Sequence, residues 1–394
     1  MQDALSDFPL RDEEGDIRPE FLHAVTNAME SGDTAHVRKL TRDLHEADLA
    51  DLLEVLRQDD RANLIEALGD EFKAAALPEL EEAVRDQVLE EMPPEQVAEA
   101  LQELESDEAV YLLEDLDQDE QQDILSKLPH FERLALQRSL KYPDDSAGRM
   151  MQTDLIAVPP FWSVGQTIDY MREADDLPER FYEIFVVDPA YHLMGCVALN
   201  KILRSKRPTQ IEAIIDEEMH PIPVETDQED VAHRFERYNM NSAPVVDDDG
   251  RLVGVITADD IVEVVQEEAS EDILAMGGVG DESVADTVWE TTRLRFSWLF
   301  ANLITAILAS IVISFFEATI QQMVALAVLM PIVASMGGNA GTQTMTVAVR
   351  ALATHDLGPA NALRVIWREC AVGLLNGLLF AVIMAAIAIF WFGS

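Results

Sequence analysis

The chain is poor in cysteine, which argues against a disulfide-rich or zinc-binding protein. It is also poor in basic residues, which argues against a protein that binds nucleic acid. Its 394 residues include two cysteines, Cys196 and Cys370, which lie far apart and indicate neither a disulfide framework nor a zinc site. Lysine and arginine number 28 against 74 acidic residues. Such a surface disfavours nucleic acid and anionic lipid and favours cations, although acidity also serves solubility. The acidic first residues contain no apolar core, so we expect no secretory signal there.

The charge is distributed unevenly along the chain. The first 290 residues hold 71 acids and 23 bases, whereas the remainder holds three acids and five arginines. An acidic front joined to an apolar back is typical of soluble domains attached to a membrane segment. We find no nucleophile–base arrangement and no phosphate-binding loop, so the sequence does not predict an enzyme.

The first 140 residues predict an all-helical domain. Apolar residues recur at three- and four-residue spacing, as in the run from Leu49 to Leu56. Residues 46–68 return as residues 94–116 at a shift of 48 positions, with seven identities in 23 positions. Short helices repeated in this way stack into a superhelix, because each pair buries its apolar face on the next.

The following residues, to about 258, predict two small α/β units. Short β-branched runs alternate with helical patterns, and the pattern Val-Val-Asp that begins at Val186 and leads to Gly195 returns from Val245 to Gly254 at a shift of 59. Each half predicts a βαββα unit, and the two would face each other across a cleft. An acidic helix follows and ends near Gly277.

Three uncharged segments in the last quarter of the chain are long enough to cross a membrane, at residues 296–316, 318–336 and 371–394. Arginines flank these segments on one side and are absent from the link near Glu317. Because basic flanks mark the cytoplasmic side, we expect the N-terminal domains to be cytoplasmic. The flanking arginines are Arg293, Arg295, Arg350, Arg364 and Arg368.

Residues 331–350 form the most informative stretch. Three glycines stand there beside Asn339 and Gln343 in a run without charge. Glycine and polar amides are costly where lipid surrounds a helix and are tolerated where the segment faces protein or a wet cavity. The segment therefore lines a passage for water or an ion, or makes a glycine-rich helix contact without transport, and the residues alone leave both readings open.

The two α/β units resemble a tandem of cystathionine-β-synthase (CBS) domains, and the whole order resembles the MgtE-type magnesium transporters. The most specific matches are Gly337-Gly-Asn-Ala-Gly-Thr-Gln343 and Asp272-Ile-Leu-Ala-Met-Gly277. The resemblance implies a multidomain membrane protein that acts as a homodimeric, Mg²⁺-selective channel of the plasma (inner) membrane, surrounded by lipid and gated by cytosolic Mg²⁺. The implied domains are an all-α superhelical N domain (1–140), two α/β CBS domains (143–205 and 206–258), a connecting "plug" helix and linker (259–290) and an α-helical transmembrane domain (291–394).

The resemblance also assigns roles to individual residues. Acids where the N domain, the CBS domains and the plug helix meet would hold regulatory Mg²⁺, a hard cation that prefers oxygen ligands. The plainer alternative for each acid is a solvated surface carboxylate. In the pore, Asn339 and carbonyls freed around the glycines would contact hydrated ions. The implied metal ligands are Glu95, Glu99, Asp227, Glu229, Asp260, Glu263, Glu268, Glu271 and Asp272, and the implied pore residues are Gly337, Gly338, Asn339, Gly341 and Gln343.

The chain departs from the family pattern in three places. The family has five spans, of which the fifth carries an ion-selecting aspartate; we find three spans and no acid within them, so we expect a chain that stops before the last two. Asn200-Lys201 stands where the family has an Arg-Asp pair that helps to hold ATP, which leaves ATP open as a ligand. Asn239 occupies a position that is often acidic. The alternatives are a transporter of another divalent cation and a non-conducting, membrane-anchored sensor of Mg²⁺ or nucleotide.

Overall fold

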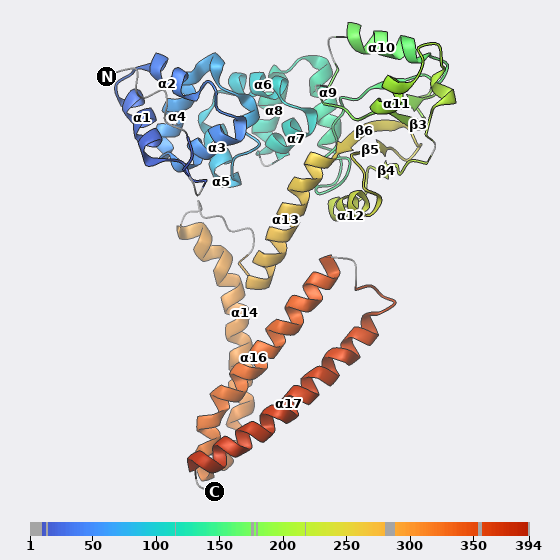
Figure 1. Ribbon diagram of the computed structural model, residues 1–394. Coiled ribbons are helices and arrows are strands. Elements are labelled where there is room, and N and C mark those ends of the chain that lie inside the picture. Colours follow the sequence, from blue (N-terminus) through green and yellow to red (C-terminus); the bar gives the residue numbers. More distant parts are fainter. Residues whose placement is uncertain are drawn as a thin grey trace. The chain divides into compact units, whose positions relative to one another are not determined.

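The computed structural model describes residues 10–12, 15–114, 116–174, 177–178, 180–216, 218–279, 288–353 and 357–392. Most of the linker expected before residue 290 and the last two residues of the third expected span lie outside this set. The chain divides into two compact units, Met1–Val265 and Gln266–Ser394 (Figure 1). Helix α13, Ala258–Gly277, runs across the division.

The first part of the first unit is helical, as predicted. The sequence repeat is also confirmed, because α3 and α6 begin 48 residues apart, as do α4 and α7. The repeated leucines are buried at equivalent places, Leu53 with Leu101 and Leu64 with Leu112. The helices are α1 (Pro19–Glu30), α2 (Thr34–Thr41), α3 (Glu46–Val55), α4 (Gln58–Leu68), α5 (Glu82–Glu91), α6 (Pro94–Glu103), α7 (Ser106–Glu114), α8 (Gln118–Lys127) and α9 (His130–Ser139), with 3₁₀ turns at Gly69–Glu71 and Ala74–Ala76.

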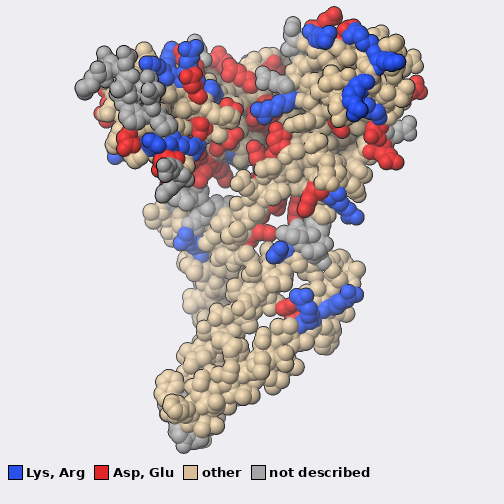
Figure 2. Space-filling model, in the orientation of Figure 1, with Lys and Arg blue, Asp and Glu red and all other residues tan. Residues whose placement is uncertain are grey.

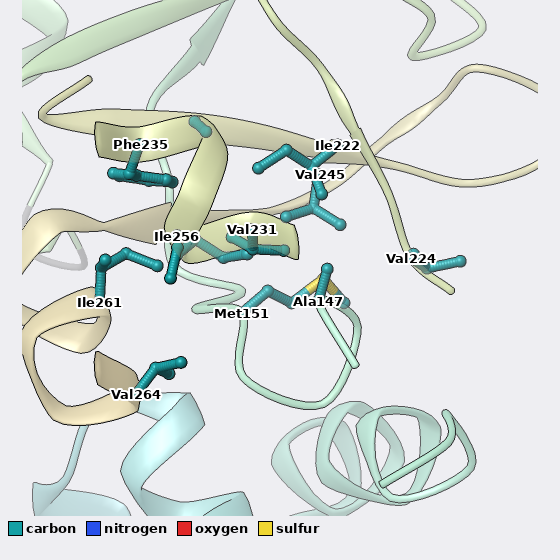
Figure 3. Packing of buried hydrophobic residues seen from close by; sticks show 12 residues of the cluster. Ala147, Met151, Ile222, Val224, Val231, Phe235, Val245, Ile256, Ile261 and Val264 are labelled. Carbon is teal, nitrogen blue, oxygen red and sulfur yellow. The ribbon is translucent and has the colours of Figure 1, made fainter. Parts of the chain in front are cut away.

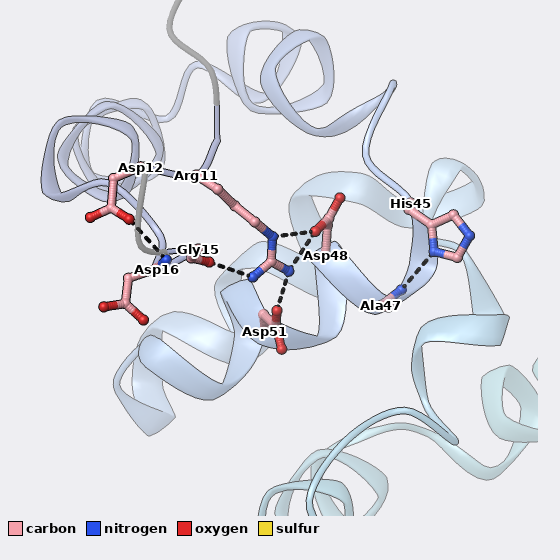
Figure 4. Close-up of polar contacts among 8 residues, drawn as sticks. All are labelled: Arg11, Asp12, Gly15, Asp16, His45, Ala47, Asp48 and Asp51. Carbon is pink, nitrogen blue, oxygen red and sulfur yellow. Dashed lines mark hydrogen bonds and ion pairs between the residues drawn. The ribbon is translucent and has the colours of Figure 1, made fainter. Parts of the chain in front are cut away.

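Arg11 connects the segment before α1 to this helical domain. The guanidinium of Arg11 donates from Nε to Oδ1 of Asp48 at 2.9 Å and from Nη1 to the carbonyl of Gly15 at 2.9 Å, and it also bonds Asp51 (Figure 4). Asp48 and Asp51 lie three residues apart on α3, on the same helix face. Arg11 therefore fixes the segment before α1 against α3.

The second part of the first unit contains the two βαββα units that the sequence predicts. In each, the first strand pairs parallel with the second, and the second pairs antiparallel with the third. The pairing register shifts at Val186/Val187 in one unit and at Val245/Val246 in the other, again 59 residues apart. The elements are β1 (Ala157–Val158), α10 (Val164–Glu173), β2 (Glu183–Val187), β3 (Leu193–Ala198) and α11 (Leu199–Arg204), then β4 (Ile222–Pro223), α12 (Gln228–Tyr238), β5 (Ser242–Val246), β6 (Leu252–Thr257) and α13.

The two halves complete each other's sheets crosswise. The segment before β1 pairs with the last strand of the second half, through Gln152 and Val255, and the segment before β4 pairs with the last strand of the first half, through Asp216 and Cys196. Both pairs exchange two backbone hydrogen bonds of 2.8–3.1 Å. The two α/β units are therefore one interlocked body.

The repeated glycine of each half allows this crossing. A Cβ atom on Gly195 would lie 2.5 Å from the carbonyl oxygen of Asp216, and one on Gly254 would lie 2.8 Å from that of Gln152. A backbone carbonyl cannot move aside as the end of a flexible side chain can. The repeat therefore keeps glycine where the exchanged segment passes over the strand.

The hydrophobic core of the second half reaches into α13 (Figure 3). Phe235 of α12 and Ile256 of β6 pack with Ile261 and Val264 of α13, and all four side chains are buried. Met151, from the exchanged segment before β1, joins the same cluster. The first turns of α13 are therefore held by the apolar core, which fixes the position of the acids beside them.

The second unit is built of helices α14 (Val288–Ser314), α15 (Glu317–Gln322), α16 (Val324–Ala353) and α17 (Ala362–Phe392). Among the described residues, two helices are long and apolar enough to cross a membrane, at Thr291–Ser314 and Ala362–Trp391. Charged side chains are sparse on the visible face of these helices (Figure 2).

The helices of this unit differ from the sequence expectations in two places. Helix α16 runs unbroken through Gly337–Gln343, so the backbone carbonyls there follow the helical hydrogen-bond pattern and are not freed for an ion. The third apolar helix begins at Ala362 rather than at residue 371, and it therefore includes one acid, Glu369. The sequence criterion of an uncharged run excluded the first two turns of this helix.

The crossing over β3 generates a stability prediction. Substitution of Gly195 by alanine should destabilise the protein by about 1–3 kcal/mol, the usual cost of overpacking, because the added methyl meets the Asp216 carbonyl. Thermal unfolding of the full chain in detergent measures the change. The matched control is Met194→Ala, whose side chain is exposed and next in sequence. Equal melting temperatures for the two variants would contradict the argument.

Candidate functional site

The start of α7 meets the start of the two α/β units within the first unit. The backbone N–H of Thr153 donates to Oγ of Ser106 at 2.7 Å, and Nε2 of Gln152 donates to Oε2 of Glu105 at 2.6 Å. Further along α7, Nε of Arg149 lies 3.6 Å from Oε2 of Glu114. These contacts place the first turn of α7 beside the first turns of α13. We call the acids gathered there, Glu105, Asp107, Glu108, Asp260 and Glu263, the acidic junction.

Local capping explains why acids begin both helices. Oε2 of Glu108 accepts the backbone N–H of Glu105 at 3.1 Å, and Oδ2 of Asp260 accepts the backbone N–H of Thr257 at 2.8 Å. Each carboxylate thus satisfies a backbone donor at a helix start, where the helix dipole also favours negative charge. The hydroxyl of Thr257 donates to Oδ2 of Asp260 as well, at 2.9 Å. Two helix starts brought together therefore bring two sets of acids together.

Burial and mutual repulsion raise the pKa values of three of these acids. Burial, followed by the charges of Asp260 and Glu105, raises the pKa of Asp107 well above its usual value. Burial also raises the pKa of Glu108 to about 7, with Glu263 among the nearby charges.

The same effects act on Asp260. Burial is the largest cause and raises its pKa to about 7, the charges of Asp259 and Glu263 add to it, and the hydrogen bonds from Thr257 oppose it. Since acids from α7 and α13 perturb one another, the junction is one electrostatic unit.

The carboxylates of the acidic junction are chemically suited to bind a cation. Oδ1 of Asp107 is shielded from solvent and has no hydrogen-bond partner among the described residues. A buried carboxylate oxygen without a donor is costly, and a cation or one of its water ligands would remove that cost. Carboxylate oxygen is the ligand type that Mg²⁺ prefers, often through retained water.

In the part of the chain that the structure describes, no group of three or more histidine, cysteine or acidic side chains converges closely enough to hold a bare metal ion. Mg²⁺ gives up its water reluctantly and is often bound through the waters that it retains.

Glu95 and Glu99, predicted ligands on the N domain, lie one turn apart on α6, and both are exposed. Oε1 of Glu95 accepts a hydrogen bond from Nζ of Lys127 at 2.7 Å, and this bond lowers the pKa of Glu95. The first predicted ligand is therefore already engaged with a lysine of α8.

The predicted ligands of the second α/β unit lie at the start of α12. Oδ1 of Asp227 caps the helix by accepting the backbone N–H of Glu229 at 3.0 Å, and Glu229 is half-buried in the first turn. At the other end of α12, Asn239 has a left-handed backbone, with φ of 50°. Asparagine tolerates this conformation well, which gives a local reason for the departure from an acid.

The predicted plug-helix ligands divide between the two units. Asp260 and Glu263 belong to the first unit and to the acidic junction, whereas Glu268, Glu271 and Asp272 follow on the part of α13 that belongs to the second unit. The predicted pore residues Gly337, Gly338, Asn339, Gly341 and Gln343 all lie on α16 and are exposed in the single chain.

Sequence reasoning missed Glu105, Asp107 and Glu108. The internal repeat contained a signal, because Asp107 aligns with Asp59 at the start of α4. That equivalence favours helix capping for both, and the repeat alone does not show that only the α7 copy faces α13.

Three segments of the chain match known domain families. Residues 44–145 match the MgtE intracellular N domain, residues 211–267 match the CBS domain, and residues 330–394 match the MgtE divalent cation transporter domain. The order of the matches agrees with the order of the structural parts described above.

Two curated relatives are magnesium transporters MgtE. The protein of Bacillus subtilis is 30% identical over 271 residues, which cover 68% of this chain and 60% of the relative. The protein of Thermus thermophilus is 33% identical over 267 residues, which cover 66% of this chain and 58% of the relative. The chain thus spans about three fifths of the length of the curated relatives it matches.

Two solved structures share the fold of the first unit. The crystal structure of the soluble part of a magnesium transporter aligns with a TM-score of 0.57 at 29% identity, covering 64% of this chain and 98% of that chain. The cytosolic domain of the Mg²⁺ channel MgtE in complex with ATP aligns with a TM-score of 0.57 at 29% identity, covering 62% and 99%. The chain therefore carries the N domain, a CBS domain and part of the transmembrane domain of the MgtE family.

Proposed function

We propose that this chain acts in Mg²⁺ transport across the plasma membrane, with its first unit in the cytosol, and that the acidic junction senses cytosolic Mg²⁺. The observation that carries the proposal is the group of acids from α7 and α13 whose pKa values are raised by burial and by one another. Magnesium transport by the curated relatives supports the choice of ion.

The physical basis is a balance between packing and repulsion. Apolar packing and the bonds of Gln152 and Thr153 hold α7 against the α/β units, while ionised carboxylates at the same place repel one another. A divalent cation bound between the carboxylates replaces their repulsion by attraction to the shared ion. Because a ligand shifts an equilibrium only by its differential affinity, Mg²⁺ favours the state in which the acids are close.

Helix α13 offers a mechanical route from the junction. It is 20 residues long, or about 30 Å at the helical rise, and carries Asp260 in its first turn. Glu268, Glu271 and Asp272 lie on its later turns and stay predicted ligands of a second regulatory position. A helix of this length transmits a displacement of its first turn as a rigid body.

In the membrane part, side chains must supply the oxygen atoms that the helical backbone does not. Asn339, Thr342 and Gln343 lie within two turns of α16, and the hydroxyl of Thr342 donates to the carbonyl of Gly338 at 3.1 Å. Side-chain amides interact well with the water shell of Mg²⁺. We therefore propose that Asn339 and Gln343 contact the hydrated ion.

Nucleotide binding and dimer formation stay predictions for this chain. Asn200 and Lys201 lie in the first turn of α11, where Lys201 offers one cation to a phosphate group in place of the paired arginine and aspartate of the family. The solved complex of the cytosolic domain of the Mg²⁺ channel MgtE with ATP supports a nucleotide as a possible ligand of this chain.

A flux measurement tests the proposed function. Reconstituted vesicles containing the full chain should take up Mg²⁺, and uptake should fall as Mg²⁺ on the cytosolic face rises. In the double variant Glu108→Gln/Asp260→Asn, we expect this dependence to flatten, with the half-closing concentration moving by at least about tenfold, or about 1.4 kcal/mol of differential affinity. Glu66→Gln, an exposed acid elsewhere in the N domain, is the control.

The outcomes separate the alternatives. Uptake of another divalent cation in preference to Mg²⁺ would favour the transporter of a different metal. No uptake of any ion by the wild type would favour the non-conducting sensor. An unchanged half-closing concentration in the double variant would show that the acidic junction is not the sensor.

The raised pKa values predict a pH dependence of stability without Mg²⁺. The folded junction keeps its protons to higher pH than the separated acids do. The stability that depends on these protons is therefore fully present only below the ordinary pKa of the acids, about 4, and is lost as pH rises through about 7. We expect the melting temperature of the wild type in EDTA to fall from pH 6 to pH 8 by on the order of 2–4 °C more than that of Asp260→Asn.

Asparagine at position 260 can still accept the bonds from Thr257, so the substitution removes the charge and keeps the cap. Parallel unfolding curves for the two proteins at every pH would show that Asp260 does not titrate in this range. Glu66→Gln again serves as the control, because Glu66 is an exposed acid of α4, outside the acidic junction.

A further inference from the structure

The apolar helix α17 contains one acid, and the structure places it against α16. Oγ1 of Thr344 on α16 lies 3.4 Å from Oε2 of Glu369 on α17. The side chain of Glu369 is 22% exposed, whereas that of its neighbour Arg368 is 64% exposed. An acid in a helix of membrane-spanning length is costly unless it faces protein or water, so its position calls for a function.

The two oxygens of Glu369 have different surroundings. Oε1 accepts hydrogen bonds from Nε and Nη2 of Arg368, at 3.2 and 3.0 Å. Oε2 is directed at Thr344, at a distance near the upper limit of a hydrogen bond. Arg368 thus engages Oε1, and Oε2 retains the capacity for a further partner.

A polar and small-residue face runs from this contact along both helices. On α17, Glu369, Gly373 and Asn376 follow at steps of four and three residues, so they share one helix face. On α16, Thr344 and Gly341 share a face by the same spacing, and Gly337 continues it.

From the Thr344–Glu369 contact, the two faces run side by side in the same direction, toward lower residue numbers on α16 and toward higher ones on α17. The helices are consecutive and are joined by eight residues, so they are antiparallel (Figure 1). Each rises about 1.5 Å per residue, so the step from Thr344 to Gly341 runs beside the step from Glu369 to Gly373. A Cβ atom on Gly341 or on Gly373 would meet nothing within 4 Å. Space therefore adjoins both glycines.

We propose that Glu369, together with Thr344, forms a cation-binding position beside the Gly337–Gln343 segment, where a hydrated Mg²⁺ is held as it enters or leaves the passage. The inference rests on the proposed function and adds a residue to it. Oε2 of Glu369 accepts a hydrogen bond from a water of the ion, and the hydroxyl of Thr344 orients that water. The carboxylate supplies the single negative charge that the amides of the α16 segment lack.

The position is at the cytoplasmic end of the membrane part under the orientation that the arginines predict. Arg364 and Arg368 belong to the first two turns of α17, as does Glu369. The ion would therefore meet this carboxylate next to the cytosol.

The adjacent thiol of Cys370 provides a reporter of a bound cation that does not depend on flux. Cys370 is exposed, and the other cysteine, Cys196, is buried. In nanodiscs containing the full chain, Mg²⁺ should slow the reaction of Cys370 with a cationic methanethiosulfonate by roughly threefold to tenfold, because a bound cation repels the reagent at a partly screened site. The reaction of an anionic methanethiosulfonate should not be slowed.

Two variants separate a cation site from a purely structural ion pair. In Glu369→Gln, which can keep its bond to Thr344, the Mg²⁺ effect on the cationic reagent should vanish. In Arg368→Gln, the effect should persist or grow, because the competing positive charge is gone. A structural pair predicts the same result for both variants. Glu317→Gln, an acid at the start of α15, is the control and should retain the full effect.

The outcome for the cation position can be told apart from the outcome for the proposed function. Protection of Cys370 that persists in Glu369→Gln, or equal slowing of both reagents by Mg²⁺, would overturn the cation position even if the wild type transports Mg²⁺. Protection that depends on Glu369 in a protein without Mg²⁺ uptake would support the binding position and refute transport. Where uptake is present, Glu369→Gln should lower it several-fold, and Glu369→Asp should restore part of it.

Discussion

The mutual repulsion of buried carboxylates at the acidic junction is the constraint on which the rest of the first unit depends. Two helix starts, those of α7 and α13, each need a negative group to satisfy backbone donors, and the fold brings these starts together. Each acid is favourable for its own helix and unfavourable for its neighbours across the junction. A protein that places such groups together acquires a contact whose strength depends on the solution, because protons or divalent cations decide whether the contact is attractive.

The surrounding structure is well suited to hold such a contact in place. Apolar side chains of α12, β6 and α13 fix the first turns of α13, and side chains before β1 reach across to α7. The contacts that hold α7 and α13 in place are therefore largely apolar or neutral, and the acidic junction lies between them. In the proposed function, this separation allows a change at the acids to alter the distance between the N domain and α13 without loss of the fold.

Much of the fold could be predicted from the sequence, because internal repeats and apolar periodicity are local patterns. The shift of 48 correctly paired α3 with α6, and the shift of 59 located equivalent strands. The structure adds that the register shifts of the two halves are also 59 residues apart. The candidate site was less accessible. Asp260 and Glu263 were predicted by resemblance, whereas Asp107 and Glu108 look like ordinary helix-start acids until the neighbouring helix is known. In the membrane part, Glu369 was excluded because an uncharged run was the criterion, although an acid that faces another helix does not prevent a helix from spanning.

The crosswise pairing of Gln152 with Val255 and of Asp216 with Cys196 makes each half of the tandem depend on the other. Neither half is complete alone, since each borrows its extra edge from the segment that precedes the other. A single half would expose that edge to water unless a second copy supplied its leading segment. The linked chain supplies both leading segments within one molecule, and the glycine at the same place in both halves leaves room for the exchanged segment.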